Sequence, residues 1–310
     1  MAEKFVPDNV TMLDTTGKTF QIKEQYGQPI IKEVMQNALI TQLGQYKDMN
    51  GPELTFDVFL NGVGAYWVGE GQRIQTTKPT WTQAKMKSHK LGVILPVTRE
   101  YLGYKQADFF EFMKGPLAEA IYKKIDSATI LGEDQPVGTE WVSIKEAAQN
   151  SGNLIEDDLT IETYNQLVDN LNDEGIEPNA YISQVKNNST LRNLVEFDGN
   201  NIARKVYENK ALDGVPVFNI NKDLATDLPK GTIYAGDFNQ VYYGIPYNMT
   251  FRISEDATLT TVQDDDGNDV NLFEREMVAM RVTFDFAYLL IDEKAVAGVA
   301  PTTGGEDDVI

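Results

Sequence analysis

Apolar residues recur at helical spacing at two places in the first half of the chain. One stretch begins at Pro29, which suits the first turn of a helix, and should end at Gly44. The other covers residues 107–131, where Gly115-Pro116 predicts a kink or a helix that properly begins at Pro116. The buried face of this second helix should carry Phe110, Met113, Leu117, Ile121, Ile125, Ala128 and Leu131.

Two further helices are expected in the middle of the chain. The first covers about residues 161–174, where Thr160 can cap the first turn and Gly175 follows the end. The second covers about 184–195. The apolar stripe of the first consists of Ile161, Tyr164, Leu167, Val168 and Leu171.

Period-two alternation predicts a long β-hairpin before the helix of residues 107–131. Residues 54–60 form one strand, and 81–89 alternate with neither face apolar enough for a core. The second strand continues as LGVILPVT, residues 91–98, an apolar run that suits burial on both sides. The hairpin should therefore start in a core and project outward through its polar part.

Strand patterns dominate from about residue 200. The clearest covers 276–290, with apolar side chains on one face against Arg281, Thr283 and Asp285 on the other. Asp266-Gly267 lies between two strand-like stretches and predicts a hairpin turn. Other strands are expected at 215–220, 231–236, 240–245 and 249–254. Helices and strands mix without strict alternation, which indicates an α+β fold.

Composition narrows the classes of function. The chain has 310 residues, 42% of them hydrophobic, which is enough for two core-bearing domains or one large one. The absence of cysteine excludes disulfides, thiolate catalysis and iron–sulfur clusters, and the single histidine, His89, excludes His-pair metal sites. No signal-like or membrane-spanning apolar run is present, so a cytoplasm is the expected compartment. A net charge of −20 argues against an electrostatic grip on nucleic acid or anionic lipid.

Positive charge is concentrated in residues 71–99. This window carries +6 and no acid, whereas the chain carries −20 and the remainder therefore −26. Ordinary surfaces mix both signs, so a merely solvated face does not account for the missing acids. A basic hairpin that projects from its own core would most easily meet carboxylates on a neighbouring copy. Such head-to-tail contacts close into rings or propagate into shells.

No catalytic constellation assembles in the sequence. Residues 263–274 suggest a calcium loop, but with Gly267 at the glycine position, Val262 and Phe273 fall where the first and twelfth ligands belong. The glycine-rich residues 62–72 lack phosphate-loop spacing. We therefore expect a protein that is not an enzyme and that takes no cofactor and no metal.

Five segments follow one another in a recognisable order. They are residues 64–102 (GAYWVGEGQ to TREYL), 109–132 (FFEFMKGPLAEAIYKKIDSATILG), 212–217 (LDGVPV), 234–245 (YAGDFNQVYYGI) and 273–301 (FEREMVAMRV to GVAP). In order and spacing they resemble the major capsid proteins of tailed phages, which share the Hong Kong 97-type fold. The resemblance covers about 29–301 and is greatest to siphophages of Gram-positive hosts.

This resemblance implies a division of the chain. The expected parts are an N-terminal arm (1–28), an extended loop (61–92), a discontinuous peripheral domain with a long spine helix (29–60, 93–134 and 239–284), an axial domain (135–238 and 285–301) and a flexible tail (302–310). The extended loop would lie over the adjacent subunit and contact it through Arg73, Lys78, Trp81, Lys85, Lys87 and Lys90.

The implied function is that of a shell protein. Pentamers and hexamers would close an icosahedral virion shell around double-stranded phage DNA, held only as non-specific content. Assembly would take place in the bacterial host cytoplasm, with a separate scaffolding protein and a portal protein as partners and no membrane. Some relatives form Lys–Asn cross-links, but the matching Asn and catalytic Glu are not identifiable here, so we expect noncovalent assembly.

Two alternatives stay open from the sequence. An encapsulin-like bacterial nanocompartment shell would use the same fold to enclose a cargo enzyme. A soluble metal-dependent hydrolase or calcium-binding module would instead use Asp264, Asp266 and Asp269.

Overall fold

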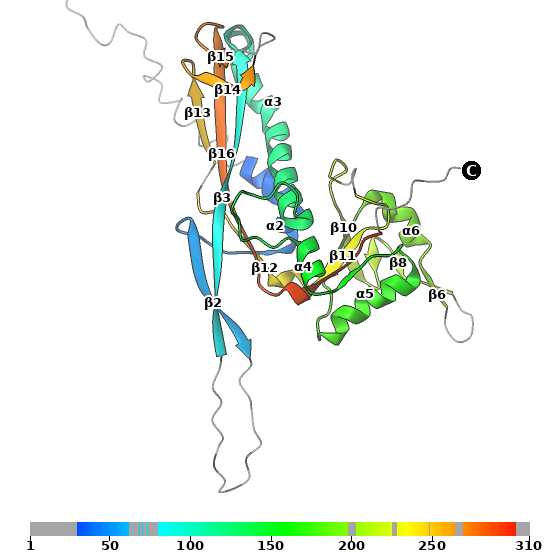
Figure 1. The fold of residues 1–310 in the computed structure, drawn as a ribbon. Coiled ribbons are helices and arrows are strands. Elements are labelled where there is room, and N and C mark those ends of the chain that lie inside the picture. Colours follow the sequence, from blue (N-terminus) through cyan, green and yellow to red (C-terminus); the bar gives the residue numbers. More distant parts are fainter. Residues whose placement is uncertain are drawn as a thin grey trace, which may run out of the picture.

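The computed structural model describes residues 30–61, 68, 70, 73, 80–197, 203–224, 228–247, 249–263 and 269–301. The expected arm (1–28) and tail (302–310) lie outside these residues, as does Lys78. Figure 1 shows a long, narrow sheet flanked by one long helix, with a second, more rounded lobe beside its middle.

The long sheet has the strand order β1-β12-β16-β3-β2, with β13 also paired to β16. β3 and β16 are antiparallel from Thr98↔Met277 to Ser88↔Ala287. The first half of β3 pairs instead with β2 and extends past the end of β16 (Figure 1). The strands are β1 Gln45–Tyr46, β2 Glu53–Asn61, β3 Thr80–Thr98, β12 Val241–Gly244, β13 Thr250–Ser254 and β16 Met277–Leu290.

One face of this sheet is covered by α3, Arg99–Asp126, which continues as a π-helical turn, Ser127–Leu131. The helix is continuous through Pro116, so the expectation that it begins there was wrong. Pro116 itself is exposed, and it removes one backbone hydrogen bond from the helix. Met113 before it and Leu117 after it pack into the core, which offsets this loss. Gly132, with φ +75°, ends the π turn.

Burial of β3 is one-sided. Leu91, Val93 and Leu95 pack on the core under α3, whereas Ile94 is 45% exposed, so the expected burial of residues 91–98 on both sides was wrong. A continuous apolar run is typical of strands that are covered on both faces. Here α3 covers only one face of the sheet, so Ile94 on the opposite face stays exposed. The alternation expected for residues 276–290 is confirmed: β16 buries Met280, Val282, Phe284, Phe286 and Tyr288 and exposes Arg281.

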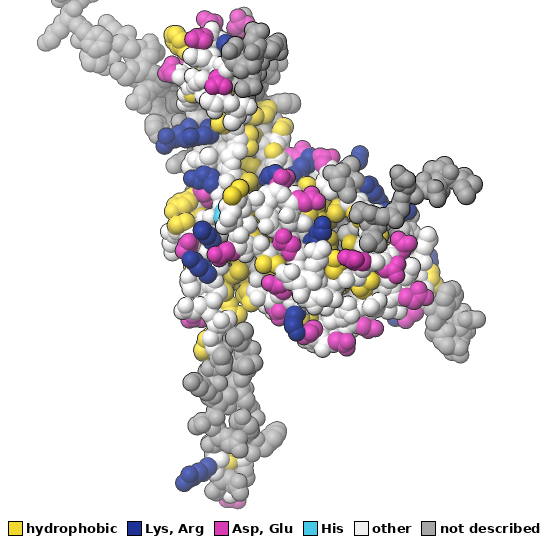
Figure 2. Space-filling model, viewed as in Figure 1, with side chains coloured by type: hydrophobic (Ala, Val, Ile, Leu, Met, Phe, Trp, Pro, Cys, Tyr) yellow, Lys and Arg dark blue, Asp and Glu magenta, His cyan; other side chains and the backbone are white. Residues whose placement is uncertain are grey.

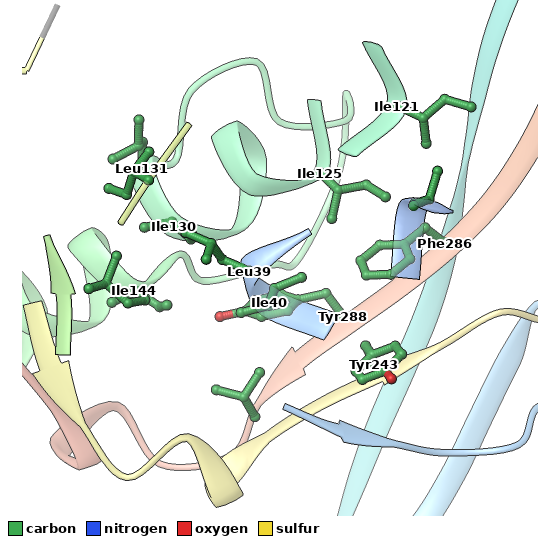
Figure 3. Close-up of a cluster of buried hydrophobic side chains, with 14 of the residues drawn as sticks. Leu39, Ile40, Ile121, Ile125, Ile130, Leu131, Ile144, Tyr243, Phe286 and Tyr288 are labelled. Carbon is green, nitrogen blue, oxygen red and sulfur yellow. The ribbon is translucent and has the colours of Figure 1, made fainter. Parts of the chain in front are cut away.

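The helix expected from Pro29 to Gly44 is broken in two. Residues 30–37 are helical, Ala38 is extended, and α2 covers Leu39–Leu43. The carboxylate of Asp126, at the end of α3, accepts hydrogen bonds from the backbone N–H of Leu39 at 3.1 Å and of Ile40 at 3.3 Å. It thereby satisfies donors that the break leaves unpaired. Figure 3 shows Leu39 and Ile40 in the core between the α3 end and β16.

The second lobe is built on a seven-stranded sheet of order β4-β17-β11-β5-β10-β9-β8. α5, Ile161–Asp173, packs on it through Tyr164, Leu167 and Leu171, as expected, with Thr160 in a capping box. The strands are β4 Leu154–Ile155, β5 Ala180–Ser183, β8 Tyr207–Glu208, β9 Ala211–Leu212, β10 Val215–Asn219, β11 Ile233–Gly236 and β17 Val296–Val299.

Smaller elements complete this lobe. The helix expected over 184–195 is shorter: a 3-10 turn, Val185–Asn187, leads into α6, Asn188–Arg192. Buried Asn187 donates to the Thr232 carbonyl at 2.7 Å and accepts from the Gly231 N–H at 2.8 Å, which ties the segment down at its start. The remaining elements are α4 Ile144–Asn150, β6 Val195–Phe197, β7 Ala203–Lys205 and the 3-10 turns Phe238–Gln240 and Glu293–Ala295.

A small hairpin caps the end of the long sheet that is opposite to β2 (Figure 1). It consists of β14, Thr258–Gln263, and β15, Asp269–Asn271, in antiparallel register, and its turn lies outside the described residues. Leu259, Val270 and Leu272 pack with Ala279. Because Ala279 alternates with Met280 along β16, this hairpin covers the face of the sheet that α3 leaves open.

Asp126 should make stability depend on pH. Burial raises the pKa of this 1%-exposed carboxyl from 3.8 to about 7, and its two backbone hydrogen bonds only partly oppose the shift. Between these two pKa values the folded state keeps a proton that the unfolded chain has lost, so stability falls as pH rises towards 7 and is then flat. Asp126→Asn should remove this slope.

Urea unfolding between about pH 4 and pH 8 measures the effect. The stability of Asp126→Asn relative to the natural chain should rise by up to about 4 kcal/mol across this window. Asp169→Asn, on the exposed face of α5, is the control and should leave the slope unchanged. Parallel pH profiles for the natural chain and Asp126→Asn would contradict a raised pKa at this carboxyl.

Candidate functional site

The hairpin β2–β3 extends the long sheet past the end of β16, at the end opposite to β14–β15 (Figure 1). Its strands pair from Glu53↔Lys87 outward to Asn61↔Thr80, with an irregularity between Phe59 and Asn61. At its inner end, the Ser88 N–H donates to the Pro52 carbonyl at 2.8 Å, where β3 changes partner from β2 to β16. The projecting part therefore continues directly from a strand of the core.

One face of the hairpin base is anchored by an apolar cluster. Met86 is fully buried with Met49 and Ala287, so the expectation that neither face of residues 81–89 belongs to a core was wrong at Met86. Met49 comes from the loop after β1 and closes over this face, which the sequence of β3 alone does not reveal. The signal lay in β2, where Leu54, Phe56 and Val58 alternate with the polar Thr55 and Asp57. Leu54, Phe56, Tyr242 and Leu289 pack around the three buried residues.

Aromatic rings and one lysine extend this cluster towards solvent. The Phe56 and Tyr242 rings lie 5.4 Å apart at 57°, and the Lys47 ammonium lies 5.3 Å from the first centroid and 5.1 Å from the second. A cation over two ring faces is attracted by their quadrupoles. The cluster joins four separate chain segments, residues 47–56, Met86, Tyr242 and residues 287–289, and so fixes the direction in which the hairpin leaves the sheet.

The other face carries most of the predicted contact residues. Trp81 is 59% exposed, and Lys87 is exposed. The Lys85 ammonium lies 2.9 Å from the Glu53 carboxylate on β2, and this hydrogen bond raises the pKa of Lys85 and lowers that of Glu53. Lys85 thus meets an acid of its own chain, while Arg73 and Lys90 are exposed in the structure. Their contact with a second subunit stays a prediction.

His89 marks the junction between the hairpin and the second lobe. Its ring packs edge-on against Trp141, with centroids 5.1 Å apart, and the Trp141 indole N–H donates to the Lys87 carbonyl at 3.3 Å. Burial, and then the nearby Lys87 charge, lower the pKa of His89. Trp141 also contacts Phe286 and Tyr288 edge-on, so it joins both lobes to one core.

The described residues also bear on the metal-binding alternative and on membrane insertion. Among them, no group of three or more His, Asp or Glu side chains is placed to hold a metal ion. Asp269 is exposed in β15, and Asp264 and Asp266 lie outside the described ranges. No helix within the described part of the chain is both long and apolar enough to cross a membrane.

Comparisons with known proteins give one consistent result. The model of the family described as "Phage capsid family" matches residues 19–300. The "Major capsid protein" of Staphylococcus phage 80alpha is 41% identical over 308 residues, covering 98% of this chain and 92% of that protein. The "Probable major capsid protein gp17" of Mycobacterium phage D29 is 21% identical, covering 97% of each chain.

Solved structures share the fold at lower identity. A chain from Mycobacterium phage Adephagia matches with a TM-score of 0.67 and 22% identity over 86% of this chain and 91% of its own. A chain from Mycobacterium phage Bobi matches with a TM-score of 0.66 and 20% identity over 98% and 96%. The likeness supports the α+β fold of the Hong Kong 97-type that the sequence predicted.

The apolar anchor of the hairpin can be tested by deletion of one side chain. Met86→Ala should destabilise the chain by about 2–4 kcal/mol, because it removes a fully buried side chain and leaves a cavity beside Met49 and Ala287. Urea unfolding measures the change. Lys87→Ala, at the next position on the exposed face, is the control and should stay within about 0.5 kcal/mol of the natural chain. Equal stability of the two variants would show that the cluster does not hold the hairpin.

Proposed function

The chain belongs to the phage capsid family and is a major capsid protein of a tailed phage, and we propose that its projecting hairpin joins one copy to the next in the head shell. Capsid proteins assemble into oligomeric shells and are components of the virion. The observation that carries the proposal is geometric: β2 and the first half of β3 continue the long sheet as a two-stranded hairpin past the end of β16 (Figure 1). An arm of this kind can reach a surface that belongs to another molecule.

The finer organisation follows from the same proposal. The long sheet with α3 is the peripheral domain, the seven-stranded lobe is the axial domain, and the hairpin is the extended loop. Pentamers and hexamers of the chain close the icosahedral shell around double-stranded DNA. A scaffolding protein and a portal protein take part, and assembly takes place in the host cytoplasm. Neither the nanocompartment nor the metal-dependent alternative has a specific observation in its favour.

Charge supplies the attraction between copies. Residues 71–99 carry +6 against −26 for the remainder of the chain. Glu53 partly neutralises the charge of Lys85. Among the described residues of this stretch, Arg73, Lys87 and Lys90 supply further exposed positive charge. Figure 2 shows acidic side chains spread widely over the second lobe, which gives a basic arm many carboxylates to meet. Exposed pairs of this kind mainly steer association and weaken with salt. Trp81 adds apolar contact area, of the type that anchors interfaces.

Charge reversal on the hairpin tests this proposal. Arg73→Glu with Lys87→Glu should leave the subunit folded, because both side chains are exposed, but should prevent or strongly reduce particle formation. Lys85 is left unchanged because it forms an ion pair with Glu53 within the chain. Lys87 is the register partner of Glu53 but forms no ion pair among the described residues, so its reversal adds only the small repulsion of an exposed pair. Negative-stain microscopy and sedimentation of the protein, expressed with its assembly partners, measure the yield of particles.

The matched control changes the same net charge elsewhere. Lys205→Glu with Lys230→Glu alters two exposed lysines of the second lobe and should assemble at nearly the natural yield. If both double variants assemble equally well, or if both fail equally, the hairpin has no special part in assembly and the proposal is wrong.

A further inference from the structure

The face of the long sheet opposite α3 is covered at its two ends and open between them. The hairpin β14–β15 packs on Ala279 at one end, and Met49 packs on Ala287 at the other. Between these residues, Arg281, Thr283 and Asp285 alternate with the buried side chains of β16 and point away from α3, and Asp285 has Lys90 of β3 as its register partner. We call the part of this open face around Arg281 the saddle; it consists of Gly92, Ile94, Thr250, Arg252, Arg281 and Thr283.

The saddle places two like charges directly opposite each other. Arg252 on β13 is the register partner of Arg281 on β16, and Ile94 on β3 is the partner of Arg281 on its other side. Both arginines are exposed, and Ile94 is 45% exposed. Like charges facing each other across two strands are unfavourable in an isolated sheet. The neighbouring cross-strand pair, Thr250 and Thr283, needs no outside partner, because the two hydroxyl oxygens lie 2.5 Å apart and are hydrogen-bonded to each other.

Neither arginine of this pair is bound to a carboxylate of the described residues. Arg252 and Arg281 have neither an ion pair nor a side-chain hydrogen bond within the described part of the chain, and Asp285, on the same face, is four residues from Arg281 along β16. Arg99, near the end of the same sheet, is by contrast paired with Glu255. Two guanidinium groups side by side present several donors in a planar arrangement that suits carboxylates or phosphates. The chemistry of the saddle therefore suits an anionic partner.

The apolar centre of the saddle favours a protein over a nucleic acid. We propose that the saddle is a docking surface for exposed carboxylates of a second copy of this chain, a step that rests on the proposed shell function. Arginine next to an exposed aliphatic side chain is typical of protein interfaces, whereas a phosphate backbone would leave Ile94 uncovered. A chain with a net charge of −20 also repels nucleic acid as a whole but offers acids to its own basic sites.

The chain contains suitable acidic segments. Three runs of three consecutive carboxylates occur at residues 156–158, 264–266 and 306–308. The run at 156–158 lies within the described residues, and all three of its side chains are exposed on the second lobe. A contact between the saddle of one copy and an acidic run of another is heterologous, which is the kind of contact that builds rings and shells.

Photocrosslinking from the saddle tests which molecule occupies it. A benzoylphenylalanine placed at Ile94 in a minority of chains is assembled with an excess of isotope-labelled natural chains, and crosslinks are identified by mass spectrometry. We expect crosslinks that join a light chain to a heavy chain near one of the acidic runs. Crosslinks only within one chain, to a different protein or to DNA, or no crosslink in well-formed particles, would overturn the inference. Failure of the natural chain to form particles at all would instead count against the shell function.

A pair of substitutions separates docking from folding. In the unassembled subunit, Arg252→Thr with Arg281→Thr should keep or raise the unfolding temperature. The double substitution removes two like charges that face each other and puts threonine, which favours strands, at both positions. The critical concentration for assembly should rise about tenfold, as for loss of a central interface contact. Arg192→Thr with Lys230→Thr removes the same charge from exposed positions elsewhere and should assemble normally. An equal rise for both pairs, no rise for either, or a lower unfolding temperature for the saddle pair would contradict the proposal.

Discussion

The structure depends on the way in which one strand, β3, changes its pairing partner along its length. From Ser88 to Thr98 it pairs with β16 in the middle of the long sheet, and from Thr80 to Lys87 it pairs with β2 alone. Backbone hydrogen bonding is continuous across the change, because Ser88 also bonds to Pro52 through both its N–H and its hydroxyl. The described base of the hairpin is therefore a direct continuation of the core sheet.

This continuity has a consequence for assembly. A capsid subunit that reaches its neighbour through a loosely held arm would have to order that arm on binding, at a cost in conformational entropy. Here the apolar cluster around Met86 and the ring pair under Lys47 hold the described base of the hairpin before any contact forms. The charges of Lys85 and Lys87, on either side of Met86, are thus presented at a defined place, which favours specific association over general attraction.

Much of the fold could be predicted from the sequence, because its signals are local. The alternation of β16, the capped helix α5 and the hairpin signalled by Asp266-Gly267 each depend on residues a few positions apart. The basic hairpin was also recognisable, since its charge and alternation lie in one contiguous stretch. Of the six residues predicted to contact a neighbour, five are described; Lys85 has its own acid, Glu53, which faces it only once the two strands are paired.

Local patterns in the chain were enough to place most helices and strands, to locate the concentration of positive charge and to recognise the family resemblance. The break in the first helix could not be found in this way, since the Asp126 carboxylate that caps α2 lies 87 and 86 residues further along the chain from its two donors, Leu39 and Ile40. The one-sided covering of residues 91–98 and the burial of Met86 likewise follow only from the three-dimensional packing. The physical reason is the same in each case. Burial and hydrogen-bond satisfaction depend on what packs against a residue, and those neighbours come from distant parts of the chain.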